Sequence, residues 1–149
     1  CYVNNVIKTL IEKLEKNYKL IIVDCEAGLE HLSRKTLGDI NYSFIVSDYS
    51  RKGVLTSIRQ VDLMKEIGII TEKNFLLINN INENYKFEDI NNILTSAGNN
   101  KIIYAGSIFN DENITEFEIQ GKSIRDLPDT AKSYSGFSEI LNDKFINLI

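Results

Sequence analysis

Four short apolar segments, each followed by a turn signal and a stretch with helical periodicity, constrain the fold of this chain most strongly. They are Leu20–Asp24, Ser43–Ser47, Asn74–Asn79 and Lys101–Ala105. Runs of Leu, Ile and Val without polar alternation are typical of strands buried on both faces of a parallel sheet. Their alternation with helices, at spacings of roughly 25–30 residues, predicts βαβ units with right-handed crossovers. The sequence therefore predicts an α/β fold of three layers, with a mostly parallel sheet flanked by helices.

The helical segments carry their apolar residues on one side. We expect them at Val3–Lys16, near Arg34 to Leu37, and at Val54–Ile67, Phe87–Ala97 and about Thr130 to Ile146. Gly68 stands where a C-terminal glycine usually ends a helix. No repeat or linker interrupts the pattern, so residues 1–149 are expected to form a single domain.

Composition excludes several classes of protein. The net charge of −4 argues against duplex DNA or an anionic membrane as the main partner. Cys1 and Cys25 are the two cysteines, too few for a disulfide framework. No apolar run is long enough to cross a bilayer. The sequence predicts a cytoplasmic protein without a nucleic-acid partner or stable membrane association.

The segment Lys19–Gly28 ends an apolar run on an acid and then supplies Glu26 and Gly28. A strand that delivers Asp24 and then a glycine loop is the Walker B and switch layout of a nucleotide hydrolase, in which the carboxylate holds the Mg²⁺ shell. No G-x-x-x-x-G-K-[ST] phosphate loop occurs among the 149 residues. The alternative for Asp24 is a strand-end residue that caps the next helix. His31 is a weak candidate for a metal ligand, because no second His or Cys stands at ligand spacing from it.

Two further polar segments follow predicted strands. Ser47–Gly53 is a polar loop in which Arg51 and Lys52 either contact a phosphate or partner, or are solvated charges at a helix start. Asn79 closes the third strand, where an amide can read a donor and an acceptor on a purine edge. A plain turn is the competing interpretation of Asn79.

In this order, the motifs resemble those of the MinD/ParA-like P-loop ATPases, and most closely the CooC-type accessory ATPases of carbon monoxide dehydrogenase maturation. The first matching segment, residues 22–34 (IVDCEAGLEHLSR), resembles the switch segment, and residues 44–53 (FIVSDYSRKG) resemble the family's SD-x-S-x-x-G loop. Residues 105–111 (AGSIFND) resemble its G-x-I-P-x-D base loop, with Phe109 in place of proline. Residues 121–128 (GKSIRDLP) resemble the ending G-x-x-L-x-x-L-P.

The resemblance implies a role for each matching residue. Asp24, Glu26 and Gly28 would serve catalysis, with Asp24 also near Mg²⁺, and the nucleotide would be held by Asp48, Asn79, Phe109 and Asp111. Cys1 fits the last cysteine of the family's Cys-x-Cys, which is implied to bind Ni or Zn across a homodimer, although it can equally be a chain-end residue. The chain is then expected to be the distal part of a P-loop ATPase, without the N-terminal phosphate-loop region.

The leading functional hypothesis is the nucleotide-binding and switch portion of an ATPase. When complete, that enzyme would couple ATP hydrolysis to nickel insertion into carbon monoxide dehydrogenase, while this chain alone is expected to be inactive. One alternative is a MinD/ParA-type positioning ATPase, for which residues 137–149 would be an amphipathic anchor; packing of this segment on the sheet is favoured because it lacks a cationic face. Another is a non-enzymatic α/β interaction module.

Overall fold

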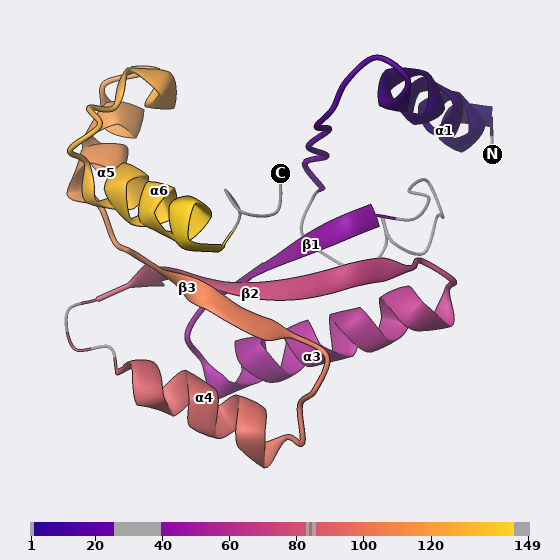
Figure 1. Ribbon diagram of the computed structural model, residues 1–149. Helices are drawn as coiled ribbons and strands as arrows, with labels where there is room; N and C mark the ends of the chain where they lie inside the picture. The colour runs from indigo at the N-terminus through magenta and orange to yellow at the C-terminus, as the bar shows by residue number, and fades with distance from the viewer. Residues whose placement is uncertain (1, 26–39, 83, 85, 145–149) are drawn as a thin grey trace.

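The computed structural model describes residues 2–25, 40–82, 84 and 86–144. The elements follow in the order α1 (Tyr2–Glu15), β1 (Ile40–Ser47), α3 (Arg51–Glu66), β2 (Thr71–Ile81), α4 (Phe87–Ser96), β3 (Ile103–Phe109), α5 (Glu112–Ile119), the short 3₁₀ helix η1 (Ile124–Asp126) and α6 (Lys132–Lys144) (Figure 1). The described part of the chain is an α/β fold with a parallel sheet between layers of helices, as the sequence predicted.

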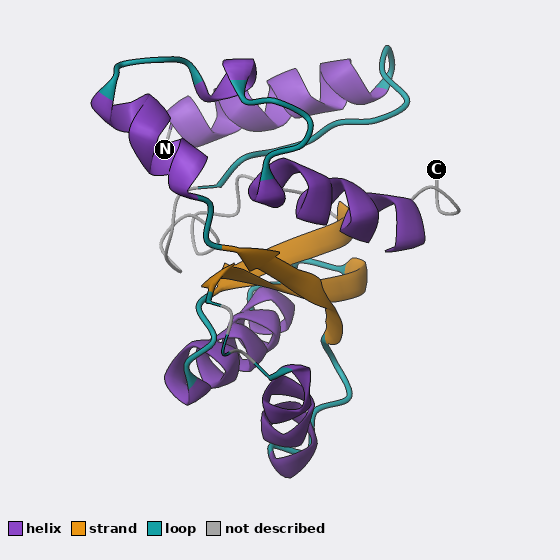
Figure 2. Ribbon diagram, turned by 90° about the vertical axis from the view of Figure 1, so that its left-hand side faces the viewer, coloured by secondary structure: helices purple, strands orange, loops and turns teal. Residues whose placement is uncertain are grey.

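The sheet has three parallel strands in the order β1-β2-β3. Phe44 lies opposite Phe75, and Phe75 lies opposite Ile103. The crossovers from β1 to β2 and from β2 to β3 run in the same direction across the sheet. Right-handed crossovers in one direction place their helices on one face, and α3 and α4 do lie together below the sheet (Figures 1 and 2).

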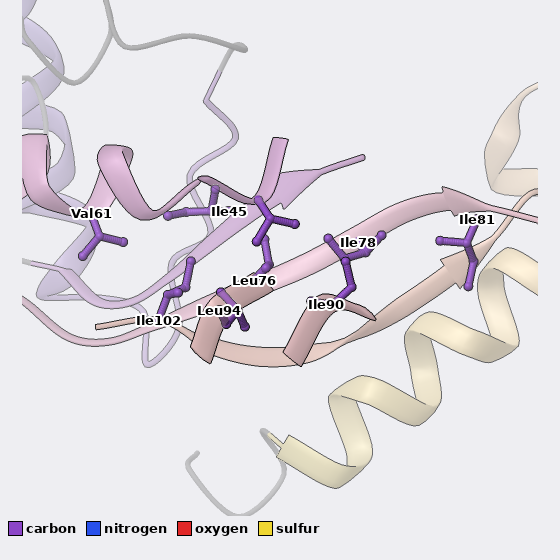
Figure 3. Packing of buried hydrophobic residues seen from close by; sticks show 9 residues of the cluster. Ile45, Val61, Leu76, Ile78, Ile81, Ile90, Leu94 and Ile102 are labelled. Atoms are coloured by element: carbon purple, nitrogen blue, oxygen red, sulfur yellow. The ribbon is translucent and has the colours of Figure 1, made fainter. Parts of the chain in front are cut away.

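The main core lies between this face and the two helices. Its buried members are Ile45, Val54, Val61, Leu76, Ile78, Ile81, Ile90, Leu94 and Ile102. Figure 3 shows the strand residues pointing toward α3 and α4, which supply Val61 on one side and Ile90 and Leu94 on the other. Burial of these β-branched and leucine side chains is the main favourable term that holds the helices on the sheet.

The opposite face is covered over β2 and β3 by α6. Phe75 and Ala105 are buried there, and Ile140 and Leu141 of α6 pack against them. Gly106, at φ 156°, permits this approach, because a Cβ at that position would lie 2.6 Å from Ile140 Cγ1. The favoured interpretation of the final segment, packing on the sheet, is therefore confirmed for α6. None of the helices in the described ranges has the length and apolarity of a membrane span.

Three of the four predicted strands are confirmed, and the prediction for Leu20–Asp24 is wrong. This segment is irregular, with Leu20 55%, Ile22 84% and Val23 43% exposed. A strand buried on both faces requires a neighbouring strand for its peptide groups, and no described strand pairs with this segment. Apolar character alone therefore does not make it a strand here.

The helix predictions are confirmed for α1, α3, α4 and α6, with shifts of a few residues at their ends. Gly68 (φ 80°) follows α3 as expected, and its N–H donates to Lys65 O (3.1 Å). The helix expected near Arg34 to Leu37 lies outside the described residues. The sequence did not predict α5 and η1, which are too short to show a clear apolar repeat.

Candidate functional site

All three strands are parallel, so their carboxyl ends lie at the same edge of the sheet. The residues predicted to bind nucleotide follow or end these strands. Asp48 directly follows β1, Asn79 lies near the end of β2, and Phe109 is the last residue of β3. Asp48 and Asn79 therefore lie at one edge of the sheet. Ligands of open α/β sheets bind outside this edge, so these residues define the candidate site.

The loop from β1 to α3 is held by short-range hydrogen bonds. The Ser50 N–H donates to Asp48 Oδ1 (2.9 Å), and the Gly53 N–H donates to Ser50 Oγ (3.0 Å), which caps α3. Hydrogen bonds from the side chain and the N–H of Ser50 lower the pKa of Asp48. A Cβ on Gly53 would collide with Asp48 Oδ1 and Ser47 Oγ. The side chains of Asp48 and Ser47 therefore occupy the space that a larger residue at position 53 would need.

A hollow of about 290 Å³ lies beside this loop. Its lining includes Asp48 from the loop, Lys52 from the first turn of α3, and Thr56, Ser57 and Gln60 further along that helix. The sequence reasoning singled out the loop but missed the three helix residues. Their spacing from Gly53, at steps of three and four residues, is the signal of a polar stripe on one face of a helix.

The end of β2 departs from regular pairing. The β2–β3 register shifts between Ile78 and Ile81, and Asn80 adopts a left-handed conformation with φ 59°. The Asn110 N–H donates to Ile81 O (2.8 Å) and restores the contact between the two strands. Asn79 and Asn80 are exposed within this irregularity. A bulge of this kind re-aims side chains at a sheet edge and leaves the Asn79 amide accessible to a ligand.

Asp111 has a different environment from the one expected of a nucleotide ligand. It is 3% exposed, and both carboxylate oxygens are occupied. Oδ1 accepts from the N–H and Nδ2 of Asn113 (3.1 and 2.7 Å), and Oδ2 accepts from the N–H and Oγ of Ser133 (2.8 and 2.9 Å). The Ser133 and Asn113 bonds lower the pKa of Asp111 to about 2. This geometry supports a positioning role that joins β3, α5 and α6.

The remaining expected site residues are not brought to this edge. Asp24 is exposed in the irregular segment that follows α1, and it ends no strand of the sheet. Cys25, which directly follows the segment predicted as a buried strand, is exposed. Partial burial and the neighbouring Asp24 carboxylate raise the pKa of the Cys25 thiol. Cys1, Glu26 and Gly28 lie outside the described residues.

The residues within the described ranges form no cluster of three or more His, Cys, Asp or Glu side chains that could hold a metal ion. A structural soft-metal site usually has four thiolate or imidazole ligands, and the expected Ni or Zn ligand of this chain, Cys1, lies outside the described residues. Mg²⁺ is commonly held by only one or two carboxylates together with phosphate oxygens and waters. Asp24, a single exposed carboxylate, has the chemistry of such a Mg²⁺ ligand.

Comparison with known proteins finds two relatives in Methanocaldococcus jannaschii. The chain is 31% identical over 147 residues to a protein named "Uncharacterized ATP-binding protein MJ0685", a match that covers 99% of this chain and 56% of that relative. It is 30% identical over 109 residues to "Uncharacterized ATP-binding protein MJ0823", covering 73% of this chain and 40% of that relative. The chain thus spans about half the length of these relatives. No protein-family model matches it.

Proposed function

We propose that this chain is the nucleotide-binding and switch portion of an ATPase. The observation that carries the proposal is the match of nearly the whole chain to a protein named for ATP binding. The parallel sheet supports it, because Asp48, Asn79 and Phe109 lie at the edge where such folds bind ligands.

Each of these residues has a distinct part in the proposal. The Asn79 amide donates and accepts hydrogen bonds on the adenine edge, and the exposed Phe109 ring packs against the base. Asp48 holds the loop that begins α3, and Lys52 supplies a cation beside the hollow. Asp24 ends no strand of the described sheet. Its proposed role, to hold the Mg²⁺ that neutralises charge on the phosphates, therefore belongs to the complete protein. Glu26 and Gly28 would sense the terminal phosphate, and Asp111 positions the loop after β3.

The test compares ATP and GTP binding by isothermal titration for the unchanged chain, Asn79→Ala and Asn41→Ala. Asn41 is the matched control, since it is an exposed asparagine near the opposite edge that donates to Glu72 Oε1 (2.6 Å). Loss of one or two hydrogen bonds to the base should weaken ATP binding about 5- to 10-fold. Asn79→Ala should also reduce the preference for ATP over GTP, whereas Asn41→Ala should leave both unchanged. ATP binding unaffected by Asn79→Ala would refute the base-reading role.

Within the proposal, the cargo of the complete ATPase is nickel for carbon monoxide dehydrogenase, and the protein acts as a homodimer. This finer step is supported by the motif resemblance of residues 22–34 and 44–53. Metal titration with sedimentation of the complete protein tests it: Cys1→Ser should abolish binding of Ni²⁺ or Zn²⁺, and Cys25→Ser should not. Undiminished binding in Cys1→Ser would instead favour a positioning ATPase, and absence of any nucleotide binding would favour an interaction module.

A further inference from the structure

Asp111 joins the starts of two helices to the loop that follows β3. Its Oδ1 accepts from the N–H of Asn113, the second residue of α5, and its Oδ2 accepts from the N–H of Ser133, the second residue of α6. The Ser133 hydroxyl donates to the same Oδ2 (2.9 Å). The positive ends of both helix dipoles favour a carboxylate at this place, and water competes little for these bonds because the side chain is 3% exposed. Asp111 therefore fixes the loop after β3 relative to α5 and α6.

The residue before this carboxylate holds the end of β2. Asn79 and Asn80 of β2 lie opposite the single residue Ile108 of β3, which makes a bulge. The Asn110 N–H donates to Ile81 O (2.8 Å) and closes this bulge. Because the carboxylate belongs to the next residue along the chain, a displacement of the carboxylate also displaces the N–H that closes the bulge.

The helix α6 is held on the sheet by apolar packing. Ala131, which precedes the helix, is 2% exposed. Ile140 and Leu141, further along the helix, pack against Phe75 of β2, and Figure 1 shows α6 lying over β2 and β3. The position of Ser133 is therefore set by the packing of the whole helix, and Ser133 in turn sets the position of the carboxylate that it holds.

We propose that Ser133 is a positioning residue for the nucleotide base, and that α6 thereby controls how the Asn79 amide meets that base. The inference rests on the proposed function, in which the Asn79 amide binds adenine. Ser133 holds Asp111, and the preceding residue, Asn110, closes the bulge. The closed bulge in turn fixes the direction of the Asn79 amide. Ser133 acts through these residues and not by contact with the nucleotide.

A positioning role has a consequence that a purely structural role lacks. Hydrogen bonds weaken steeply when their geometry is poor, so a loosened bulge should weaken recognition of adenine, whose edge the Asn79 amide matches. Contacts to the ribose and the phosphates, which ATP and GTP share, should change little. Removal of the Ser133 hydroxyl should therefore change the preference between the two nucleotides, whereas a loss of stability alone would weaken the binding of both equally.

Isothermal titration with ATP and GTP provides the first readout. It is done on the unchanged chain, Ser133→Ala, Ser133→Thr and Ser135→Ala, at a temperature where circular dichroism shows every variant to be folded. Ser133→Ala should weaken ATP binding about 3- to 5-fold and leave GTP binding almost unchanged. Ser133→Thr keeps a hydroxyl and should restore the preference for ATP. Ser135→Ala is the matched control on α6, because the Ser135 hydroxyl donates only within the helix region, to Ala131 O and Lys132 O, and it should alter neither affinity.

Hydrogen exchange provides a second readout, part of which does not need nucleotide. In Ser133→Ala the Asn110 amide should exchange about 10-fold faster, while the Leu76 amide in the middle of β2 should not change. Coupling between two sites is reciprocal. ATP should therefore slow exchange of the Ser133 amide in the unchanged chain by about the factor by which Ser133→Ala weakens ATP binding. If Ser133→Ala does not fold, this protection of the Ser133 amide by ATP, and its absence with GTP, decides the question.

The outcomes separate this proposal from the proposed function. If the unchanged chain binds ATP, and Ser133→Ala weakens neither nucleotide or weakens both equally, the role of Ser133 is overturned while the proposed function stands. An unchanged rate of exchange at Asn110 in Ser133→Ala would also overturn this role. If the unchanged chain binds neither nucleotide, the proposed function is overturned, and the role of Ser133 with it.

Discussion

Replacement of Asp111 should affect the stability of the fold, because Asp111 joins β3, α5 and α6 in the structure, whereas the sequence predicted it as a nucleotide ligand. Its Oδ1 caps α5 through Asn113, and its Oδ2 accepts two hydrogen bonds from Ser133 at the start of α6. Asp111→Asn keeps the shape of the side chain but replaces one oxygen with an amide donor. At least one of the two donor pairs then loses its acceptor in a site that is 3% exposed.

The magnitude follows from these bonds. Hydrogen bonds to a charged group contribute about 1.5–3 kcal/mol, and a weakened N-cap costs about 1 kcal/mol. We therefore expect Asp111→Asn to lower the free energy of unfolding by about 2–3 kcal/mol, which corresponds to a decrease in melting temperature of about 5–10 °C for a chain of this size. Urea unfolding at pH 7 and thermal melts followed by circular dichroism measure both quantities. Asp129→Asn, at an exposed position in the loop before α6, is the matched control.

The pH dependence gives an independent check on the same carboxylate. Its pKa is lowered from 3.8 to about 2 in the folded protein. A lowered pKa stabilises the fold above the unfolded value, and this contribution is lost as the pH falls toward the folded value. The difference in unfolding free energy between the unchanged protein and Asp111→Asn should be constant above about pH 5 and shrink from pH 4 to pH 2. A difference that grows on acidification, or an effect no larger than that of Asp129→Asn, would refute the reasoning.

Three further predictions concern packing, buried polarity and activity. Gly106→Ala should destabilise the protein by about 1–3 kcal/mol because its Cβ meets Ile140. Gly136→Ala, in open space on α6, should instead stabilise it by about 0.5–1 kcal/mol. Urea unfolding of both variants measures these changes in stability. Asn74→Ala should cost about 2–3 kcal/mol in the same assay, since it leaves the buried Ser43 hydroxyl without its acceptor; a loss below 0.5 kcal/mol would contradict this. The 149-residue chain should release no measurable phosphate from ATP, because it contains no phosphate loop; turnover that is abolished by Asp24→Ala would show that another segment replaces that loop.

The strands that could be predicted are those whose neighbours lie close in sequence. A helix returns β2 to β1 and another returns β3 to β2, so an apolar run sufficed to identify these strands. Leu20–Asp24 has the same composition but no described strand beside it. Composition reports a tendency to be buried, and pairing depends on segments far away in the chain.

The candidate site could also be predicted only in part from the sequence. Asp48 and Asn79 follow from the positions of strand ends, because parallel strands bring their carboxyl ends to one edge. The environment of Asp111 was not predictable, since its partner Ser133 is 22 residues away on a helix that must first dock on the sheet. The need for glycine at position 106 has the same origin, as Ile140 approaches it from that helix.

The polar contacts near the amino edge of the sheet have a consequence for misfolding. Ser43 Oγ donates to Asn74 Oδ1 (2.7 Å), and Asn74 Nδ2 donates to Lys101 O (3.2 Å), so one amide joins the segments of all three strands. If β1 slipped by two residues along β2, its alternating Ile, Phe and Val side chains would keep their faces and lose little apolar burial. The Ser43 hydroxyl would then be buried away from its acceptor. This contact therefore selects one alignment among several that the apolar side chains alone would tolerate, and protects a Val- and Ile-rich sheet from trapping in a shifted pairing.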